Sequence, residues 1–400
     1  MENLQNNCSL LGCLSPSATL VISGKAKELK KQGLNVCSLS AGEPDFDTPQ
    51  AIKDACIKAL NEGKVGYTPA SGLPELKQAI VNKFAKNGIS TAPENIVVSP
   101  GAKFAIFTAI TSLCGSGDEV LIPAPYWLSY PEIVKAAGAV PLVVPTSANN
   151  HYQITAEQLE AAVTPKTKLL ILNSPSNPAG TVYSKENLCK IAAFAQKHNL
   201  MILSDEIYEE LIYDTESKHV SIASLSEDAA ARTITVNGFS KAYAMTGWRL
   251  GYLTAPLWLA KRIAALQSHS TSNPTSFVQY AGIAALNGAA DREVAEMRKA
   301  FGKRRDLICS LLSNIKNISF IKPNGAFYVL CDISSFGLSS ELFCQKLLKE
   351  ALVAAIPCNS FGAEGYIRLS YACSEENIAE AIQRLGKFCA NLTPIQKLTA

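Results

Sequence analysis

The sequence lacks the patterns that mark membrane and secreted proteins. Its 400 residues contain no uninterrupted run of about 18 apolar residues, the length that a membrane-spanning helix needs. The first residues, MENLQNNCSLLGCLSPSATL, have no basic segment ahead of a long apolar one, which a secretory signal would show. The formal net charge of +3 is too small to indicate nucleic acid or an anionic membrane as a partner. These absences predict a cytoplasmic protein that binds a small molecule.

Metal and nucleotide motifs are missing as well. The 12 cysteines and 4 histidines form neither a CxxC pair nor an HExxH pattern, so no metal is expected. Without a secretory signal, the cysteines are interpreted as small buried apolar residues in a reducing compartment. GSGDEV, from residue 115, begins like GxGxxG but ends in valine and precedes its strand, and no GxxxxGK[ST] occurs. A nicotinamide dehydrogenase and a nucleotide hydrolase are therefore poorly supported.

Short apolar runs recur along the chain, many of them separated by segments of helix length. Runs that are apolar throughout, rather than alternating, indicate strands covered on both faces, as in a parallel or mixed sheet between helices. The sequence predicts a doubly wound, mostly parallel, seven-stranded α/β sheet. Its strands are NIVVS from 95, EVLIPA from 119, VPLVVP from 140, KLLILN from 168, LMILSDE from 200, RTITVNG from 232 and LGYLTAP from 250.

The pattern changes near residue 296, where the charged segment MRKAFGKRRDLICSLLSNI is followed by GAFYVLCDI. We expect a large domain of residues 46–295 and a smaller α+β domain built from residues 1–45 and 296–400. Two such domains would leave a cleft between them.

Polar residues that directly follow the apolar runs are candidate ligand contacts, because ligands of open α/β sheets bind at the carboxyl ends of the strands. Gly101 begins a helix, which would favour a phosphate or only form a turn. Asp205 and Tyr208 follow a buried strand, where the carboxylate needs a cationic partner or caps a helix. Asn177 in NSPSNPAG would contact the ligand or only form a turn, and Trp127 in PYWLSYP would support a cofactor or pack in the core. Each position alone leaves both interpretations open.

Lys241 is the only charged residue between residues 236 and 248, in VNGFSKAYAMTGWRLGY. A single lysine is more often a surface residue. Together, however, the amine, the carboxylate, the tyrosine, the asparagine, the aromatic ring, the glycine turn and Arg249 suit pyridoxal phosphate. This cofactor needs an imine-forming lysine, an anionic partner for its ring nitrogen and a phosphate site.

Seven motifs that span nearly the whole chain carry a resemblance to a known family. They are AGEPDFDTP, GYTPASG, PYWLSYP, NSPSNPAG, SDEIYE, SKAYAMTGWRLGY and FGAEGYIRLSYA, in this order. With them, the sequence resembles the fold-type I, class I pyridoxal-phosphate aminotransferases, and is most similar to the bacterial and archaeal branch of the aspartate aminotransferases.

The resemblance implies the residues around the cofactor ring. Lys241 would bond to the cofactor and later move the proton between the substrate Cα and C4′, for which its pKa must lie below that of an ordinary lysine. Asp205 would pair with the ring nitrogen. Tyr208 and Asn177 would hydrogen-bond the ring hydroxyl oxygen, and Trp127 would stack on the ring and border the substrate.

The resemblance also implies the phosphate contacts and the assembly. The backbone of Gly101 and Ala102 would bind the phosphate together with Arg249 and the neighbouring Lys103. Tyr67 would reach the phosphate from a second subunit, so a homodimer with shared active sites is expected.

Substrate binding is implied by three further matches. Arg368 would bind the α-carboxylate of the substrate with its planar fork, helped by the Gly42 backbone and Asn177. Lys103 would contact a distal carboxylate or would only add charge near the phosphate. Exchange between aspartate and 2-oxoglutarate by a ping-pong mechanism is the expected reaction.

Several departures leave the substrate open. Phe104 replaces a glutamine-like residue, PCNS precedes FGAEG where relatives tend to have a glycine after the proline, and the stretch before SPSATL lacks the basic residues of some relatives. Aromatic amino acid or prephenate transamination, alone or combined with the aspartate reaction, is the alternative. A lyase or synthase with the same cofactor, or a degenerate binding domain of a regulator, has less support.

Overall fold

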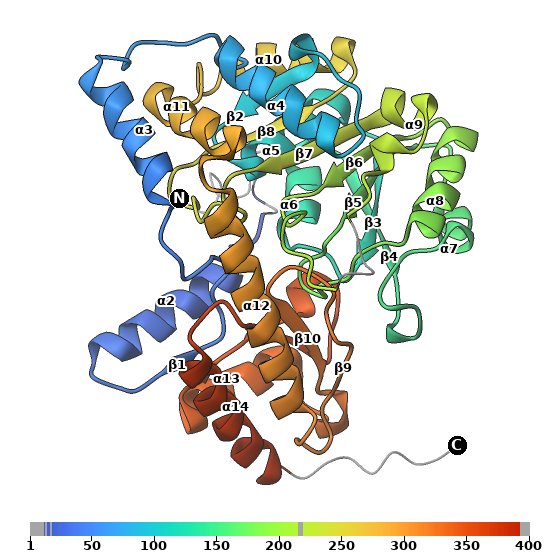
Figure 1. Cartoon of the computed structure of the whole chain (residues 1–400). Coiled ribbons are helices and arrows are strands. Elements are labelled where there is room, and N and C mark those ends of the chain that lie inside the picture. Colours follow the sequence, from blue (N-terminus) through green and yellow to red (C-terminus); the bar gives the residue numbers. More distant parts are fainter. Residues whose placement is uncertain (1–11, 13, 17, 215–218, 393–400) are drawn as a thin grey trace, which may run out of the picture.

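The structure is a computed structural model that describes residues 12, 14–16, 18–214 and 219–392 (Figure 1). Most of the stretch before SPSATL, and Cys8 and Cys13 within it, lie outside the described residues. The ten described cysteines are all free, and eight of them are buried. Among the described residues, no helix combines the length and the apolar character that crossing a membrane requires.

A seven-stranded sheet forms the upper part of the molecule in Figure 1. Its order is β2 (Ile96–Ser99), β8 (Gly251–Thr254), β7 (Thr233–Gly238), β6 (Met201–Asp205), β5 (Thr167–Asn173), β3 (Glu119–Ala124) and β4 (Val140–Pro145). Only β8 runs antiparallel to its neighbours β2 and β7. The predicted mostly parallel α/β sheet and its seven strands are confirmed.

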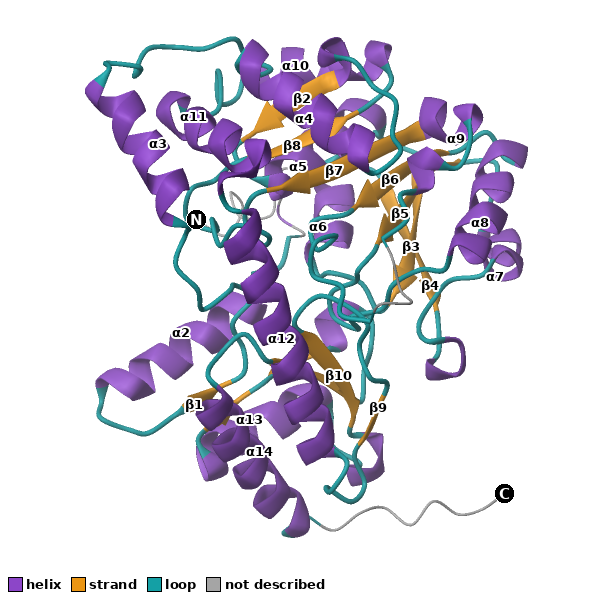
Figure 2. Cartoon of the chain, viewed as in Figure 1, coloured by secondary structure: helices purple, strands orange, loops and turns teal. Residues whose placement is uncertain are grey.

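Helices cover both faces of this sheet (Figure 2), because alternate strand residues point to opposite sides. Val97, Val120 and Ile122 pack with α5 (Ala102–Leu113), α6 (Ser129–Ala136) and α10 (Leu257–Ser268). On the other face lie α3 (Gln50–Asn61), α4 (Pro74–Lys86) and α11 (Ser276–Ala284), and farther along α7 (Ala156–Ala162), α8 (Lys185–Lys197) and α9 (Glu227–Arg232).

One strand departs from the prediction of burial on both faces. In β4, Val140 and Val143 are 48% and 46% exposed. The reason is that β4 is the last strand of the sheet and pairs only with β3. The apolar run therefore predicted the strand correctly here, but not how far its side chains are buried.

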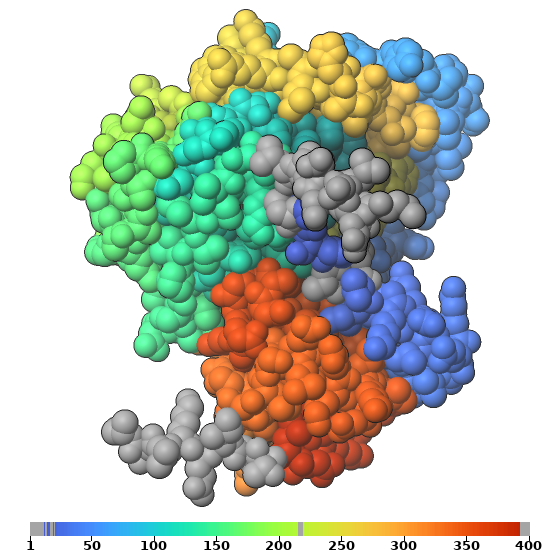
Figure 3. All heavy atoms as spheres, turned by 180° about the vertical axis from the view of Figure 1, so that it is seen from behind, coloured from blue at the N-terminus to red at the C-terminus, as the bar shows by residue number. Residues whose placement is uncertain are grey.

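The lower part in Figure 1 holds two small sheets. The antiparallel one has the order β12 (Ile356–Pro357), β13 (Tyr366–Ser370), β10 (Tyr328–Asp332) and β9 (Ser319–Phe320), and β1 (Cys37–Ser38) pairs in parallel with β11 (Val353–Ala354). Helices α2 (Ala18–Lys31), α13 (Ser340–Ala351) and α14 (Glu375–Ala390) surround these sheets. Figure 3 shows N-terminal residues in blue side by side with the C-terminal residues in orange and red.

Helix α12 (Asp291–Leu312) runs from the large sheet to the small ones. The boundary expected between residues 295 and 296 falls inside this helix. The division into residues 46–295 and residues 1–45 with 296–400 remains a prediction.

Candidate active site

A cavity of about 740 Å³ opens at the carboxyl ends of β5, β6 and β7 and is also lined from β10, β13 and α2. It brings together ten of the twelve residues that the sequence singled out. These are Gly42, Ala102, Lys103, Trp127, Asn177, Asp205, Tyr208, Lys241, Arg249 and Arg368. Segments more than 300 residues apart in the chain thus meet at one site, as the rule for open α/β sheets predicts.

Lys241 lies in the turn that follows β7, and its Nζ donates a hydrogen bond to the carbonyl oxygen of Gly42. The amine lies 5.8 Å from the ring centre of Tyr208 and 5.6 Å from that of Phe327. Burial, and then the positive charge of Arg368, lower the pKa of Lys241 to about 8. A fraction of this amine is therefore neutral near pH 7, as a nucleophile or a base requires.

Asp205 ends β6 and is 4% exposed. Its Oδ2 accepts a hydrogen bond from Tyr130 Oη at 2.6 Å, and its Oδ1 accepts one from the Ile207 N–H at 3.3 Å. Burial raises the pKa of Asp205 to about 6, although both hydrogen bonds and Lys241 lower it. A cation bound next to this carboxylate would keep it ionised.

The start of α5 forms another part of the cavity wall, through Ala102 and Lys103. Gly101 has φ +89°, and a Cβ at this position would lie 2.3 Å from Arg249 Nη2, so only glycine admits the guanidinium. The first N–H groups of a helix have no partner within it and mark the positive end of its dipole. Arg249 therefore lies beside a turn suited to an anion. Gly101 itself is not among the residues that line the cavity.

Arg368, in β13, is 2% exposed. Its Nη1 donates to Asn177 Oδ1 at 2.9 Å and its Nη2 to the Ser40 carbonyl at 3.2 Å, and its Nε has no partner among the described residues. No carboxylate of the described residues lies within 4.0 Å of the guanidinium. A buried cation without an anion is costly, so this position suits a carboxylate of a ligand.

Aromatic side chains border the space between these groups. Tyr208 Oη and Tyr328 Oη lie 2.9 Å apart, and the Lys103 amine lies 4.8 Å from the Trp127 ring centre. Burial, and then Arg249, lower the pKa of Lys103. A flat, partly anionic ligand fits a cavity with these walls and charges.

Tyr67 does not line the cavity of its own chain. It lies in the loop between α3 and α4, and 93% of its surface is exposed. Its expected role therefore depends on a second copy of the chain.

Sequence reasoning missed several polar residues that line the cavity, among them Ser40, Glu43, Tyr130 and Tyr328. Tyr130 stands in the quoted motif PYWLSYP, three residues after Trp127, which is about one helical turn. Tyr328 stands in GAFYVLCDI, which was noted only as part of the smaller α+β domain. Attention to hydroxyls in these two motifs would have found both.

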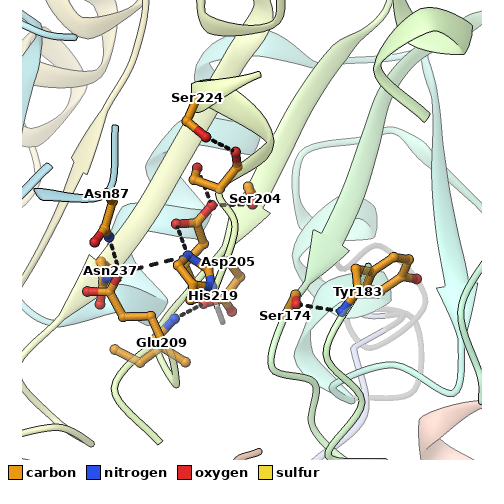
Figure 4. A network of polar contacts seen from close by, with 12 residues as sticks. Asn87, Ser174, Tyr183, Ser204, Asp205, Glu209, His219, Ser224 and Asn237 are labelled. Carbon is orange, nitrogen blue, oxygen red and sulfur yellow. Dashed lines mark hydrogen bonds and ion pairs between the residues drawn. The ribbon is translucent and has the colours of Figure 1, made fainter. Parts of the chain in front are cut away.

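Another polar cluster lies behind the end of β6 (Figure 4). His219 Nε2 is 2.8 Å from Glu206 Oε2 and 3.8 Å from Glu209 Oε2, a grouping that no sequence pattern predicts. Ser204 and Ser221 donate to Glu206, and Lys83 and Asn87 donate to Glu209. The carboxylates already have protein partners, so the cluster is explained as a structural network.

The residues of the cavity fit pyridoxal phosphate. They offer a buried amine of lowered pKa, a carboxylate with both oxygens held, and an arginine beside a glycine turn at a helix start. The orphaned Nε of Arg368 leaves a further position for the carboxylate of an amino acid.

Comparisons with known proteins agree with the geometry. Residues 35–385 match the family model described as aminotransferase class I and II. An aspartate aminotransferase of Bacillus sp. strain YM-2 is 50% identical over 381 residues, which cover 94% of this chain and 97% of that protein. An aspartate/prephenate aminotransferase of Thermus thermophilus is 43% identical over 377 residues, covering 94% of this chain and 96% of the relative.

Solved structures of similar proteins have the same fold. The Thermus thermophilus aspartate aminotransferase with maleate superposes with a TM-score of 0.92 at 42% identity, covering 95% of this chain and 99% of that one. An aspartate aminotransferase from Rhizobium meliloti superposes with a TM-score of 0.92 at 39% identity, covering 96% and 99%.

Proposed function

Because this chain belongs to the class I and II aminotransferases, we propose that it exchanges the amino group between L-aspartate and 2-oxoglutarate. The enzyme is pyridoxal-phosphate-dependent, and its substrates are small amino and oxo acids. The observation that carries the choice of a dicarboxylic substrate is the pair of cations, Arg368 and Lys103, that line one cavity with Lys241. Curated relatives named aspartate aminotransferase support it.

Residues of the chain divide the work of holding the cofactor. Pyridoxal phosphate supplies an aldehyde for bonding to amines and a ring that withdraws electrons from the substrate Cα. We propose that Asp205 holds the ring nitrogen, that Tyr208 and Asn177 hold the ring hydroxyl oxygen, and that Trp127 covers one ring face. The Gly101 turn, the Ala102 N–H and Arg249 would hold the phosphate.

Proton transfer falls to Lys241 Nζ. The amine, with its pKa lowered to about 8, would take the proton from the substrate Cα and hold it on Nζ for return, while the bound cofactor would supply the electron-withdrawing ring that makes this proton acidic. The Gly42 carbonyl accepts a hydrogen bond from Nζ and orients it. A general base of this kind contributes about 10²- to 10⁴-fold to the rate.

Substrate orientation falls to Arg368. Its guanidinium is held by Asn177 and Ser40 and packs 4.3 Å from the Tyr328 ring centre, so little side-chain freedom is left to lose when a carboxylate binds. We propose that Lys103, which lines the same cavity beside Trp127, receives the distal carboxylate of aspartate.

A panel of amino donors with 2-oxoglutarate tests the substrate. Lys103→Ala should lower kcat/KM for aspartate by about 10- to 100-fold, as expected for the loss of a charged hydrogen bond, and that for phenylalanine much less. Equal losses would mean that Lys103 does not contact the distal carboxylate. Lys135→Ala is the matched control, because Lys135 is a lysine of α6 that does not line the cavity.

A second substrate class is favoured by the relatives named aspartate/prephenate aminotransferase. The same donor panel with prephenate as acceptor tests for dual specificity. Prephenate turnover together with aspartate turnover would show it.

We propose that the enzyme is a cytoplasmic homodimer with Tyr67 crossing to the phosphate site of the partner. Support comes from exposed apolar residues around the same loop, since Ile57, Val65 and Tyr67 are 52%, 61% and 93% exposed. Sedimentation of the holoenzyme tests the assembly, and a monomer would contradict it.

We also propose that the cavity separates domains of residues 46–295 and of residues 1–45 with 296–400.

A further inference from the structure

Tyr130 touches two of the residues that are proposed to hold the cofactor ring, Asp205 and Trp127. It lies in α6 and is 1% exposed, and its hydroxyl donates to Asp205 Oδ2 at 2.6 Å. Its ring meets the Trp127 ring edge to face, with centres 5.3 Å apart and an interplanar angle of 83°. One buried side chain thus contacts the proposed nitrogen partner and the proposed ring cover.

The hydrogen bond has a fixed direction. Burial and the neighbouring Asp205 raise the pKa of Tyr130 well above its ordinary value, so the hydroxyl keeps its proton and donates. The other carboxylate oxygen accepts from the Ile207 N–H. A carboxylate offers about four lone pairs, so positions remain on Asp205 for a ring N–H.

We propose that Tyr130 is a positioning residue for transamination, whose hydroxyl holds the Asp205 carboxylate, ionised and correctly turned, against the ring nitrogen. The inference rests on the proposed function. In the part of the chain that the structure describes, Tyr130 is the only side chain that hydrogen-bonds to this carboxylate.

The charges around Asp205 explain why a fixed donor matters. Glu206 repels the ionised carboxylate, Lys241 attracts it, and Tyr208 is a further titratable neighbour. Burial raises the pKa of Asp205 to about 6, while the Tyr130 hydrogen bond lowers it. Without that hydrogen bond, protonation of Asp205 would extend toward neutral pH, and a protonated carboxyl no longer favours a protonated ring nitrogen.

Tyr130→Phe in the full-length holoenzyme tests the inference. We expect the dissociation constant of pyridoxal phosphate, measured by titration of the apoenzyme, to rise about 10-fold, as for a hydrogen bond to a charged group. The acidic limb of the kcat profile should move to higher pH, while KM for aspartate changes little. The midpoint of the pH titration of the bound cofactor, followed by its absorbance, should also move to higher pH.

Tyr371→Phe is the matched control. Tyr371 is fully buried and its hydroxyl donates to the Ala326 carbonyl at 3.1 Å, away from Asp205. This variant should lose similar stability but keep the pH profile and the cofactor affinity. Equal shifts in both variants, or none in Tyr130→Phe, would overturn the inference. If the wild-type enzyme neither binds the cofactor nor transaminates, the proposed function itself fails.

Discussion

Two clusters of buried charge lie on opposite sides of the end of β6, and only one of them is neutralised by the protein. Asp205 points into the cavity, whereas Ser204 and Glu206 meet each other in the network behind the sheet. Neighbouring residues of a strand face opposite sides, so consecutive carboxylates, Asp205 and Glu206, serve different clusters.

The difference lies in the partners of the cations. In the network, Lys83 is 2.8 Å from Glu209 and 2.6 Å from Glu210, and His219 is 2.8 Å from Glu206. In the cavity, none of Lys241, Arg249 and Arg368 forms an ion pair within the described part of the chain. Charges that the fold does not pair are available to a ligand, and perturbed groups of this kind mark functional sites.

Removing a cavity cation should therefore abolish function and spare the fold. Lys241→Ala should lower kcat by at least about 10⁴-fold, since it removes the proposed base and the proposed covalent attachment together. The free energy of unfolding of the apoenzyme should stay level or rise, because a desolvated amine is removed. Single-turnover kinetics and urea unfolding measure the two effects, and full activity in this variant would refute the assignment of the site.

Removing a cation from the network should have the opposite effects, namely a loss of stability with little change in activity. Glu209 and Glu210 raise the pKa of Lys83 well above its ordinary value, even though burial lowers it. Lys83→Met should cost about 3 to 5 kcal/mol of unfolding free energy, because it leaves buried carboxylates without their cation. The kcat of the folded fraction should change less than about threefold, which corresponds to less than about 0.7 kcal/mol in the activation free energy.

Lys86→Met is the control for this comparison. Lys86 lies on the same helix, α4, and is exposed without an ion pair in the described structure. We expect a change within about 0.5 kcal/mol. If Lys83→Met destabilises no more than Lys86→Met, the network does not stabilise the fold.

The contrast also explains what the sequence could predict. Strand-end residues such as Asp205 and Asn177 were found because parallel strands bring their carboxyl ends to one edge. For Lys241, only the combination with these residues and the seven motifs predicted a place in the site. These predictions use residues that are neighbours in the sequence, so the sequence alone is enough to make them.

Contacts between distant elements were beyond the sequence. Tyr130 reaches Asp205 across 75 positions, and Lys83 reaches Glu209 through the packing of α4 near the end of β6. His219 and Glu206 stand 13 positions apart with no helical or strand spacing between them. Such pairs are set by tertiary packing, which no periodicity encodes.

The smallest expected effect is a pH dependence of stability that belongs to the network. Burial lowers the pKa of His219, but the carboxylates of Glu206 and Glu209 outweigh it and raise the pKa above its ordinary value of 6.5. A group with a raised pKa in the folded state stabilises below its unfolded value, and this contribution is lost as the pH rises through the folded pKa. Stability from His219 should therefore fall on going from about pH 6 to alkaline pH.

His219→Gln should flatten that part of the profile, whereas His269→Gln, at an exposed position, should leave it unchanged. Urea unfolding at several pH values measures the difference. The kcat profile of His219→Gln should keep the acidic limb of the wild type, because we assign that limb to Asp205 in the cavity. A shift of the limb would show that the two clusters, despite facing opposite sides of β6, are coupled through the peptide that joins Asp205 to Glu206.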